Sequence, residues 1–238
     1  MDNLISVGIK IELKQTLNRN EAQNENARNY VSQVLDISDI TFQAAMPIYG
    51  GHLVPLEVGA KYDVIFKTEK GLYKAVCEVV GRSKIEKIYL VELKPISKLE
   101  KFQRREYFRF NTNIDASICL ISENEMKNFI QLLTFPEEYK NKKKTAAIID
   151  ISGGGVKIVS NELYKKNDIV LIEFNVMVGS IFKNLNVLGR VIASTTSDNR
   201  LDLREHRIEY NKIPKEIREL IVKYIFDEQK KILQKERG

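Results

Sequence analysis

Residues 61–80 read KYDVIFKTEKGLYKAVCEVV, and this stretch predicts a β-hairpin. Residues 61–68 and 72–80 are the two expected strands, and Glu69, Lys70 and Gly71 join them. A tight turn between antiparallel strands needs positive φ, which glycine adopts without steric cost. We therefore expect Gly71 to make the turn.

The β pattern continues on both sides of this hairpin. Apolar residues alternate with polar ones over residues 5–13, which is the period of a strand with one buried face. A polar stretch at 18–29 predicts a loop, and Pro47, Gly50, Gly51 and Pro55 mark a longer connection. Further strands are expected at residues 30–35, 41–45 and 87–93. Short strands at this spacing indicate a small barrel.

A second β-rich region follows Pro95. Between the two regions, residues 96–103 show no sustained periodicity and predict a linker, so the expected domains are 1–95 and 104–238. An insertion at 123–144 has apolar residues spaced for a short helix, namely Met126, Phe129, Ile130 and Leu133. The strands expected in the second domain are 114–120, 146–151, 156–160, 169–174, 185–193 and 201–210.

The C-terminus predicts an amphipathic helix. Pro214 stands where the first turn of a helix tolerates proline, and Lys and Arg are frequent near the end. This helix either packs on the second barrel or docks a partner. Its apolar residues at helical spacing are Ile217, Leu220, Ile221, Tyr224 and Ile225.

Composition is that of an ordinary folded protein, with 43% hydrophobic and 29% charged residues in 238. No apolar run approaches the ~20 residues that span a bilayer, and MDNLISVGIKIEL lacks the pattern of a secretory signal. We expect a cytoplasmic protein. Cys77 and Cys119 are expected as reduced core residues, a structural pair being the alternative. His52 and His206 form no ligand cluster, so no metal is expected.

A net charge of +6 is compatible with an anionic partner, and one basic segment stands out. Arg105 and Arg109 are four residues apart, with Arg104 directly before them. Residues at this spacing share a side of an extended or helical segment. Guanidinium can fork onto a phosphate, bind the O6/N7 edge of guanine or stack on a base. By itself the spacing is also typical of arginines on a solvated helix.

The second motif is Asp150-Ile151-Ser152-Gly153-Gly154-Gly155, a DxSxxG pattern directly after an apolar run. Asp150 can accept hydrogen bonds from the donor edge of guanine or orient an arginine, and Ser152 can bond a phosphate. Gly153, Gly154 and Gly155 would allow positive φ and a close approach to a ligand. The alternative is a glycine-rich turn in which the aspartate bonds its own backbone.

An arginine pair at a domain junction, followed by a strand and DxSxxG, resembles the PilZ family of cyclic di-GMP receptors. Residues 59–64, Lys94-Pro95 and the junction 103–109 are similar to the YcgR-type flagellar brake, in which a YcgR N-terminal domain precedes PilZ. Gly189-Arg190-Val191 resembles a later barrel strand of the family. The family's glycine before the final strand is missing from residues 205–210, and the insertion at 123–144 is longer than a minimal connection.

The resemblance implies a mainly β fold: an N-terminal split barrel, a C-terminal PilZ barrel and a C-terminal amphipathic helix. It implies a receptor, not an enzyme, that binds cyclic di-GMP without a metal. The implied ligand contacts come from Arg104, Arg105, Arg109, Asp150, Ser152, Gly153, Gly154 and Gly155.

The implied mechanism is a change in interdomain arrangement on binding, which brakes flagellar motility through a motor stator or switch protein. The protein would then be recruited to the flagellar basal body, beside the membrane but not inserted in it. Control of exopolysaccharide synthesis is the alternative within the receptor class. Binding of single-stranded nucleic acid is the alternative outside it, although no aromatic stacking platform is evident and nucleic acid is not an expected partner.

Overall fold

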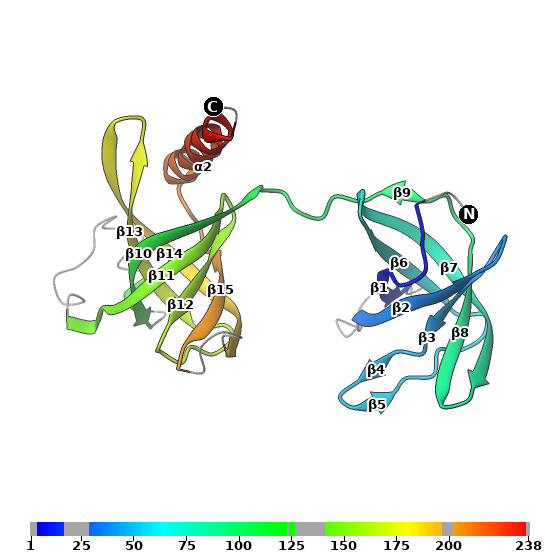
Figure 1. The fold of residues 1–238 in the computed structure, drawn as a ribbon. Coiled ribbons are helices and arrows are strands. Elements are labelled where there is room, and N and C mark those ends of the chain that lie inside the picture. Colours follow the sequence, from blue (N-terminus) through cyan, green and yellow to red (C-terminus); the bar gives the residue numbers. More distant parts are fainter. Residues whose placement is uncertain (1–3, 17–28, 123, 127–140, 197–201, 237–238) are drawn as a thin grey trace. The chain divides into compact units, whose positions relative to one another are not determined.

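The computed structural model describes residues 4–16, 29–122, 124–126, 141–196 and 202–236. The loop predicted at 18–29 lies outside this range apart from Asn29, and so does the predicted helix beyond Met126. The chain forms two compact units, Met1–Arg104 and Arg105–Gly238. Both are built mainly from antiparallel strands (Figure 1), which confirms the predicted fold class.

The first unit is a seven-stranded antiparallel sheet that closes on itself. The strand order is β6-β1-β2-β3-β8-β7-β9, and an additional β6–β7 pairing completes a ring. Strands β4 and β5 form a separate hairpin. The strands are β1 (Lys10–Gln15), β2 (Asn29–Ile37), β3 (Phe42–Ala45), β4 (Ile48–Tyr49), β5 (His52–Leu53), β6 (Lys61–Thr68), β7 (Gly71–Ile85), β8 (Ile88–Pro95) and β9 (Glu100–Lys101).

Strand β7 closes the ring because it is long enough to pair with both β6 and β8, and β9 adds a short pairing at Tyr73 and Lys74. Its first half pairs with β6, from Thr68 opposite Gly71, and its second half pairs with β8. Gly71 has φ +117° at the β6–β7 turn, as predicted. The register shifts between Val79 and Gly81, and such a bulge bends a strand toward a new partner.

The first strand is shorter than its alternation predicts. Gly8 has φ +91° in a turn before β1, and Val7 is 59% exposed. The turn takes residues 5–9 out of the ladder, although the Gly8 amide still donates to the Val34 carbonyl. The prediction of a strand over residues 5–9 is therefore wrong, and burial of alternate residues begins at Ile11.

The second unit is a closed barrel with the order β10-β11-β12-β15-β14-β13. Its interior is a single apolar cluster drawn from every strand. The strands are β10 (Arg109–Ile121), β11 (Lys144–Ser152), β12 (Gly155–Ser160), β13 (Ile169–Val178), β14 (Ile181–Thr196) and β15 (Arg204–Tyr210).

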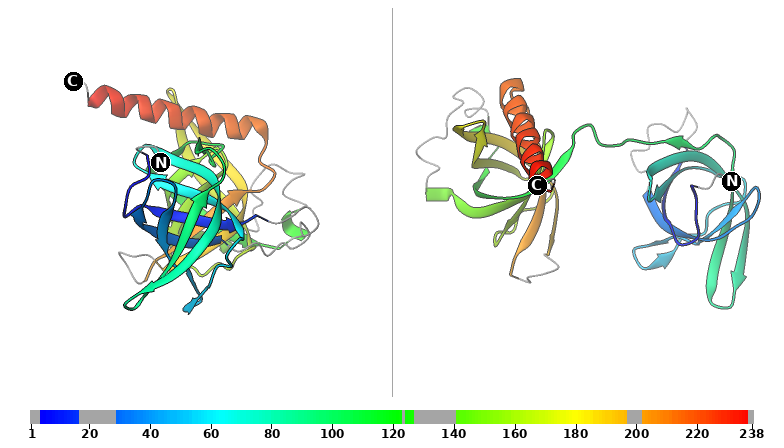
Figure 2. Two further views of the ribbon diagram at one scale, coloured as in Figure 1. Left: turned by 90° about the vertical axis from the view of Figure 1, so that its right-hand side faces the viewer. Right: turned by 45° about the horizontal axis from the view of Figure 1, so that its top comes forward.

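Helix α2 (Lys215–Lys235) packs on this barrel (Figures 1 and 2). Ile221, Tyr224 and Ile225 are buried in the same cluster as the barrel residues. The helix therefore packs on the second barrel as one of the two predictions has it, and Pro214 is its N-cap. Within the part of the chain that the structure describes, the helices are too short or too polar to span a bilayer.

The two cysteines and His206 belong to the cores. Cys77 and Cys119 are buried and free, as predicted. His206 is fully buried in β15, where its ring nitrogens contact Ser194 Oγ at 2.9 Å and the Glu162 carbonyl at 3.1 Å. Strand β15 pairs in regular register with β12 from Gly155 to Ser160, so the missing family glycine does not interrupt this edge.

Candidate ligand-binding site

The two motifs meet on the second barrel, where β10 starts and β11 ends. Arg109 is the direct partner of Ser152 in the β10–β11 ladder, and Asn111 is the partner of Asp150. Partners in a ladder present their side chains on the same face, and residues two apart in a strand share that face. Phe110 and Ile151 occupy the opposite face and pack in or against the core.

Asp150 lies among three basic side chains. Burial raises the pKa of its carboxyl, and the charges of Arg109, Lys157 and Arg105 act in the opposite direction. Arg105 and Arg109 are exposed, whereas Asp150 is half-buried. The site therefore offers outward-facing cations and one partly desolvated acceptor, which suits an anion that also carries hydrogen-bond donors.

Ser152 is only 8% exposed, and its hydroxyl bonds within the turn. It donates to the Gly155 carbonyl at 3.0 Å and accepts from the Gly154 amide at 3.3 Å. A hydroxyl has one proton to donate. To donate a hydrogen bond to a phosphate, the Ser152 hydroxyl would therefore have to give up its bond to the Gly155 carbonyl.

The three glycines are required by space and not by φ, so the prediction of positive φ is wrong. A Cβ on Gly155 would lie 2.2 Å from the Ile208 carbonyl oxygen, because β12 and β15 approach closely there. A Cβ on Gly153 would lie 2.4 Å from Tyr107 Cδ1, and one on Gly154 would lie 3.1 Å from Tyr107 Cδ2. The Tyr107 ring thus covers Gly153 and Gly154.

Sequence reasoning missed Tyr107 and Arg218 as parts of this site. The Tyr107 hydroxyl accepts a hydrogen bond from Arg218 Nη1 at 2.5 Å, and Arg218 lies in the first turns of α2. Tyr107 could have been found from its place between Arg105 and Arg109. Arg218 carried no local signal, because it is 111 residues away in the chain.

The two phenylalanines beside the arginines behave differently. Because large apolar rings are usually buried, the sequence predicts both Phe108 and Phe110 in the core. Phe110 does pack against it, with an edge-on contact to Tyr224 at 6.5 Å between ring centroids. Phe108 is 61% exposed, so the prediction is wrong for it. Phe108 precedes β10, where no ladder pairing turns its side chain toward the barrel interior.

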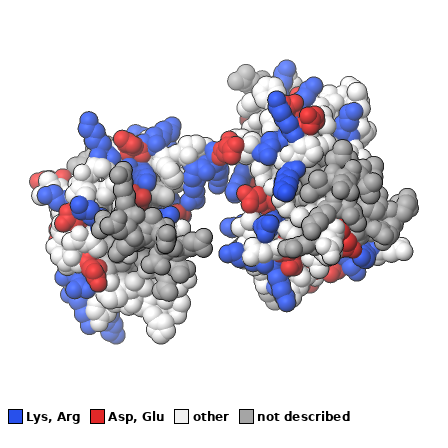
Figure 3. All heavy atoms as spheres, turned by 180° about the vertical axis from the view of Figure 1, so that it is seen from behind, with Lys and Arg blue, Asp and Glu red and all other residues white. Residues whose placement is uncertain are grey.

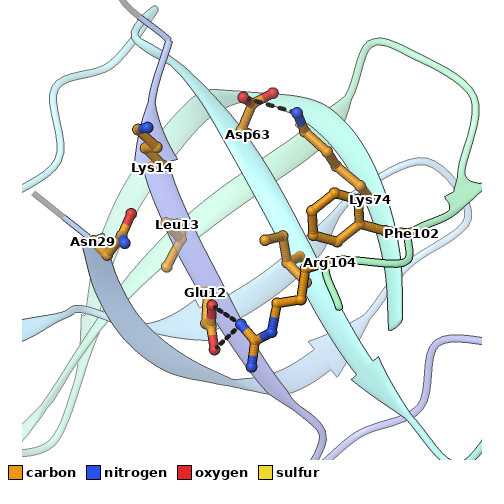
Figure 4. A pocket seen from close by; sticks show the side chains of 9 residues that line it. Glu12, Leu13, Lys14, Asn29, Asp63, Lys74, Phe102 and Arg104 are labelled. Atoms are coloured by element: carbon orange, nitrogen blue, oxygen red, sulfur yellow. Dashed lines mark hydrogen bonds and ion pairs between the residues drawn. The ribbon is translucent and has the colours of Figure 1, made fainter. Parts of the chain in front are cut away.

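Arg104 belongs to the first unit, whereas the other predicted contact residues belong to the second. Its Nη1 contacts the Glu12 carboxylate at 2.9 and 3.2 Å, and Lys67 pairs with the same carboxylate at 2.6 Å. Arg104 and Glu12 line a pocket on the first unit (Figure 4). The other lining residues are Leu13, Lys14, Asn29, Asp63, Ile65, Lys74 and Phe102.

The sequence run Lys142-Lys143-Lys144 predicts a solvated loop or, as the alternative, a contact with an acidic partner. In the structure the three lysines pair with carboxylates of their own unit. Lys142 contacts Glu125 at 3.1 Å, Lys143 pairs with Glu173, and Lys144 lies 3.8 Å from Glu162. Acidic side chains also lie among the basic ones on the face seen in Figure 3. The net charge is therefore not gathered into this run.

A metal centre finds no support in the described part of the chain. No group of three or more His, Cys, Asp or Glu side chains there could hold an ion.

Gly189, Arg190 and Val191 lie in β14, where Arg190 pairs with Glu209 of β15. They belong to the barrel wall and not to the β10–β11 junction.

Solved structures share this fold. The inhibitor of motility MotI/DgrA from Bacillus subtilis aligns with a TM-score of 0.72 at 17% identity, covering 94% of this chain and 98% of that one. YcgR from Escherichia coli, solved in complex with c-di-GMP, aligns with a TM-score of 0.50 at 15% identity, covering 97% and 88%. A search of curated protein sequences gave no match.

Family models cover most of the chain. The model described as flagellar protein YcgR matches residues 6–95, and the PilZ domain model matches residues 103–227, which is more than half of the chain. Both motifs and the whole second barrel fall within the PilZ match. The chain therefore belongs to the PilZ-domain family, with a YcgR-type domain ahead of its PilZ domain.

Proposed function

We propose that this protein is a receptor for cyclic di-GMP, without catalytic activity. The observation that carries the proposal is the register of β10 and β11, which places Arg109 opposite Ser152 and Asp150 two residues away on the same face. Family membership and the YcgR complex with c-di-GMP support the choice of ligand. The contacting residues would be Arg104, Arg105, Arg109, Asp150, Ser152, Gly153, Gly154 and Gly155.

The chemistry of these groups fits a guanine dinucleotide with two phosphates. Arg105 and Arg109 are exposed and can bond phosphate oxygens or the O6/N7 edge of guanine. Asp150 can accept from the donor edge of guanine, at N1 and N2, when it is ionised. Each charge-assisted hydrogen bond contributes ~1.5–3 kcal/mol, so a few suffice for micromolar affinity after ordering costs.

In the free protein, the Glu12 carboxylate occupies the guanidinium of Arg104 that the ligand phosphate would bind. A phosphate that recruits Arg104 must therefore replace this ion pair. Arg104 is 42% exposed at the side chain, and exposed pairs contribute only ~0–1 kcal/mol. A doubly charged ligand can therefore replace the Arg104–Glu12 ion pair at little cost in free energy.

The proposed output is a brake on flagellar motility through a motor stator or switch protein. It is supported by the match of residues 6–95 to the model of the flagellar protein YcgR and by the structural likeness to an inhibitor of motility. Ligand contacts at residues 104–109, where one unit ends and the next begins, would change the arrangement of the two units.

Calorimetric titration with cyclic di-GMP tests the ligand and the site together. We expect binding by the wild type and at least tenfold weaker binding by Arg105→Ala, Arg109→Ala and Asp150→Ala. Arg82→Ala is the matched control, because Arg82 is an exposed arginine on the first unit, and it should bind normally. Unchanged affinity in all three site variants rejects the site, and no binding by the wild type rejects the ligand.

Two further measurements test the output. Small-angle scattering should change on addition of cyclic di-GMP, and identical profiles would count against a rearrangement. In a flagellated bacterium with high cyclic di-GMP, production of the wild type should slow swimming, whereas production of Arg109→Ala should not. Equal swimming speeds for both proteins would reject the brake while leaving ligand binding intact.

A further inference from the structure

Three chain segments meet at the Tyr107 ring, all within the second unit. The first is the segment that carries Arg105 and Arg109. The second is the Gly153–Gly154 turn beneath the ring, where a Cβ at Gly153 would lie 2.4 Å from Cδ1. The third is α2, whose Arg218 donates to the Tyr107 hydroxyl at 2.5 Å.

The turn and the helix are themselves connected. The Tyr210 amide donates to the Gly154 carbonyl at 3.0 Å, so the end of β15 is bonded to the glycine turn. Only residues 211–214 separate β15 from α2, and the Arg218 amide donates to the Pro214 carbonyl in the first turn of the helix. Arg218 is therefore held at a defined place beside the turn.

Helix α2 also contacts the first residues of β10. The Tyr224 ring packs edge-on against Phe110, and the Tyr224 hydroxyl lies 3.3 Å from Thr112 Oγ1. Arg218 and Tyr224 thus contact the chain on both sides of Arg109. Residues 105–108 precede the ladder of β10, so its backbone pairing does not hold them, and the contacts of Tyr107 with Arg218 and the glycine turn restrict where they lie.

We infer that Arg218 of α2 is a positioning residue for the ligand site and acts through Tyr107. Its bond to the phenol holds the ring against Gly153 and Gly154, and the ring in turn fixes the backbone that presents Arg105 and Arg109. The inference rests on the proposed function for the identity of the ligand. The pre-ordering itself is a property of the free protein.

Pre-ordering raises affinity because residues 105–108 then lose less conformational entropy when the ligand binds. A bond between a charged donor and a phenol, together with a guanidinium carbon 5.1 Å from the ring centroid, is worth roughly tenfold in an equilibrium constant. Loss of Arg218 should then weaken binding about tenfold, although Arg218 itself does not contact the ligand.

The first test uses the free protein. Hydrogen exchange of amides 105–108 should be faster in Arg218→Met than in the wild type, while exchange within β12 and β14 stays the same. Arg218→Lys keeps a donor for the phenol and should restore most of the protection. Lys223→Met removes a charge from an exposed position of the same helix and is the control. Equal exchange in Arg218→Met and the wild type overturns the inference.

The second test is affinity for cyclic di-GMP by calorimetry. We expect about tenfold weaker binding for Arg218→Met and a smaller loss for Tyr107→Phe, which removes the bond but keeps the ring beneath the guanidinium. The double variant should bind no more weakly than Arg218→Met, because the loss of Arg218 already removes both contacts. Arg218→Lys should recover most of the affinity, and Lys223→Met should bind cyclic di-GMP as the wild type does. Unchanged or tighter binding by Arg218→Met overturns the inference. If amides 105–108 exchange faster in Arg218→Met but the wild type does not bind cyclic di-GMP, then Arg218 does order the segment through Tyr107, and the proposed ligand is wrong.

Discussion

Arg109 and Ser152 face each other across the β10–β11 ladder, 43 residues apart in the chain. This pairing brings the end of the arginine motif to the middle of the DxSxxG motif. The backbone hydrogen bonds of a closed barrel set the pairing, so it does not depend on flexible side chains. The two motifs therefore form one surface on a rigid support.

Asp150→Asn should separate stability from binding. Burial raises the pKa of Asp150 in the folded protein, so its ionised form is disfavoured there. The stabilising effect of this shift is complete below the ordinary pKa of 3.8 and is lost as pH rises through the folded value.

At neutral pH the uncharged asparagine should therefore leave the free energy of unfolding equal to or above that of the wild type, measured with urea. Binding of cyclic di-GMP should still fall at least tenfold in the same variant. Asp115→Asn, at an exposed position of β10, is the control and should change neither quantity. A large loss of stability in Asp150→Asn would contradict the assignment.

Alanine at Gly155 and at Gly153 should have different effects. At Gly155 the new Cβ meets the backbone of Ile208 at 2.2 Å, and barrel backbone cannot move away cheaply. We expect about 1–3 kcal/mol of destabilisation in urea unfolding. At Gly153 the Cβ meets the Tyr107 ring instead, so the ring should move while the barrel keeps its stability to within about 1 kcal/mol.

Near-ultraviolet circular dichroism should detect the displaced tyrosine in Gly153→Ala. Gly154→Ala, with its contact at 3.1 Å, should show a smaller change. If Gly153→Ala proved as destabilising as Gly155→Ala, the turn would be part of the barrel core and not a platform for Tyr107.

His206 should make the second barrel sensitive to mild acid. Burial lowers the pKa of its ring below the ordinary 6.5, against the effect of the bonded Glu162 carbonyl. The unfolded chain then binds the proton more readily, so stability should fall as pH drops below about 6.5. Urea midpoints of wild type and His206→Gln, measured at pH 7.5 and 5.5, should show a smaller pH dependence in the variant. Equal dependence would exclude His206 as the cause.

Helix α2 should contribute strongly to the stability of the second barrel. Ile221 is fully buried between helix and barrel, and truncation of such a side chain typically costs about 2–5 kcal/mol. Ile221→Ala should lower the urea midpoint accordingly. Val222→Ala changes the neighbouring residue, which is 45% exposed, and should stay within about 0.5 kcal/mol of the wild type. Similar small effects for both would mean that the helix is not part of the core.

Local periodicity was sufficient for α2 and for every strand longer than two residues, but not for β4, β5 and β9, which are too short to show a period and of which β9 lies in the predicted linker. The side chains of a strand alternate and those of a helix recur every three to four residues, so burial leaves a pattern in the chain itself. The apolar stripe from Ile217 to Ile225 predicts the helix in this way. The local conformational preferences of glycine and proline place the turn at Gly71 and the start of the helix at Pro214. Residues 5–9 misled the same reasoning, because the positive φ of Gly8 breaks the strand without breaking the alternation.

The longer strands, α2, the two motifs and the resemblance to PilZ proteins could be predicted from the order of residues. The pairing of Arg109 with Ser152, the cover of Tyr107 over Gly153 and the bond from Arg218 to Tyr107 could not, because they exist only in the folded barrel. These contacts join segments separated by 43 to 111 residues, and no local period encodes which distant segments pair. Barrel closure and helix packing select them, because only one register buries the apolar face of every strand together.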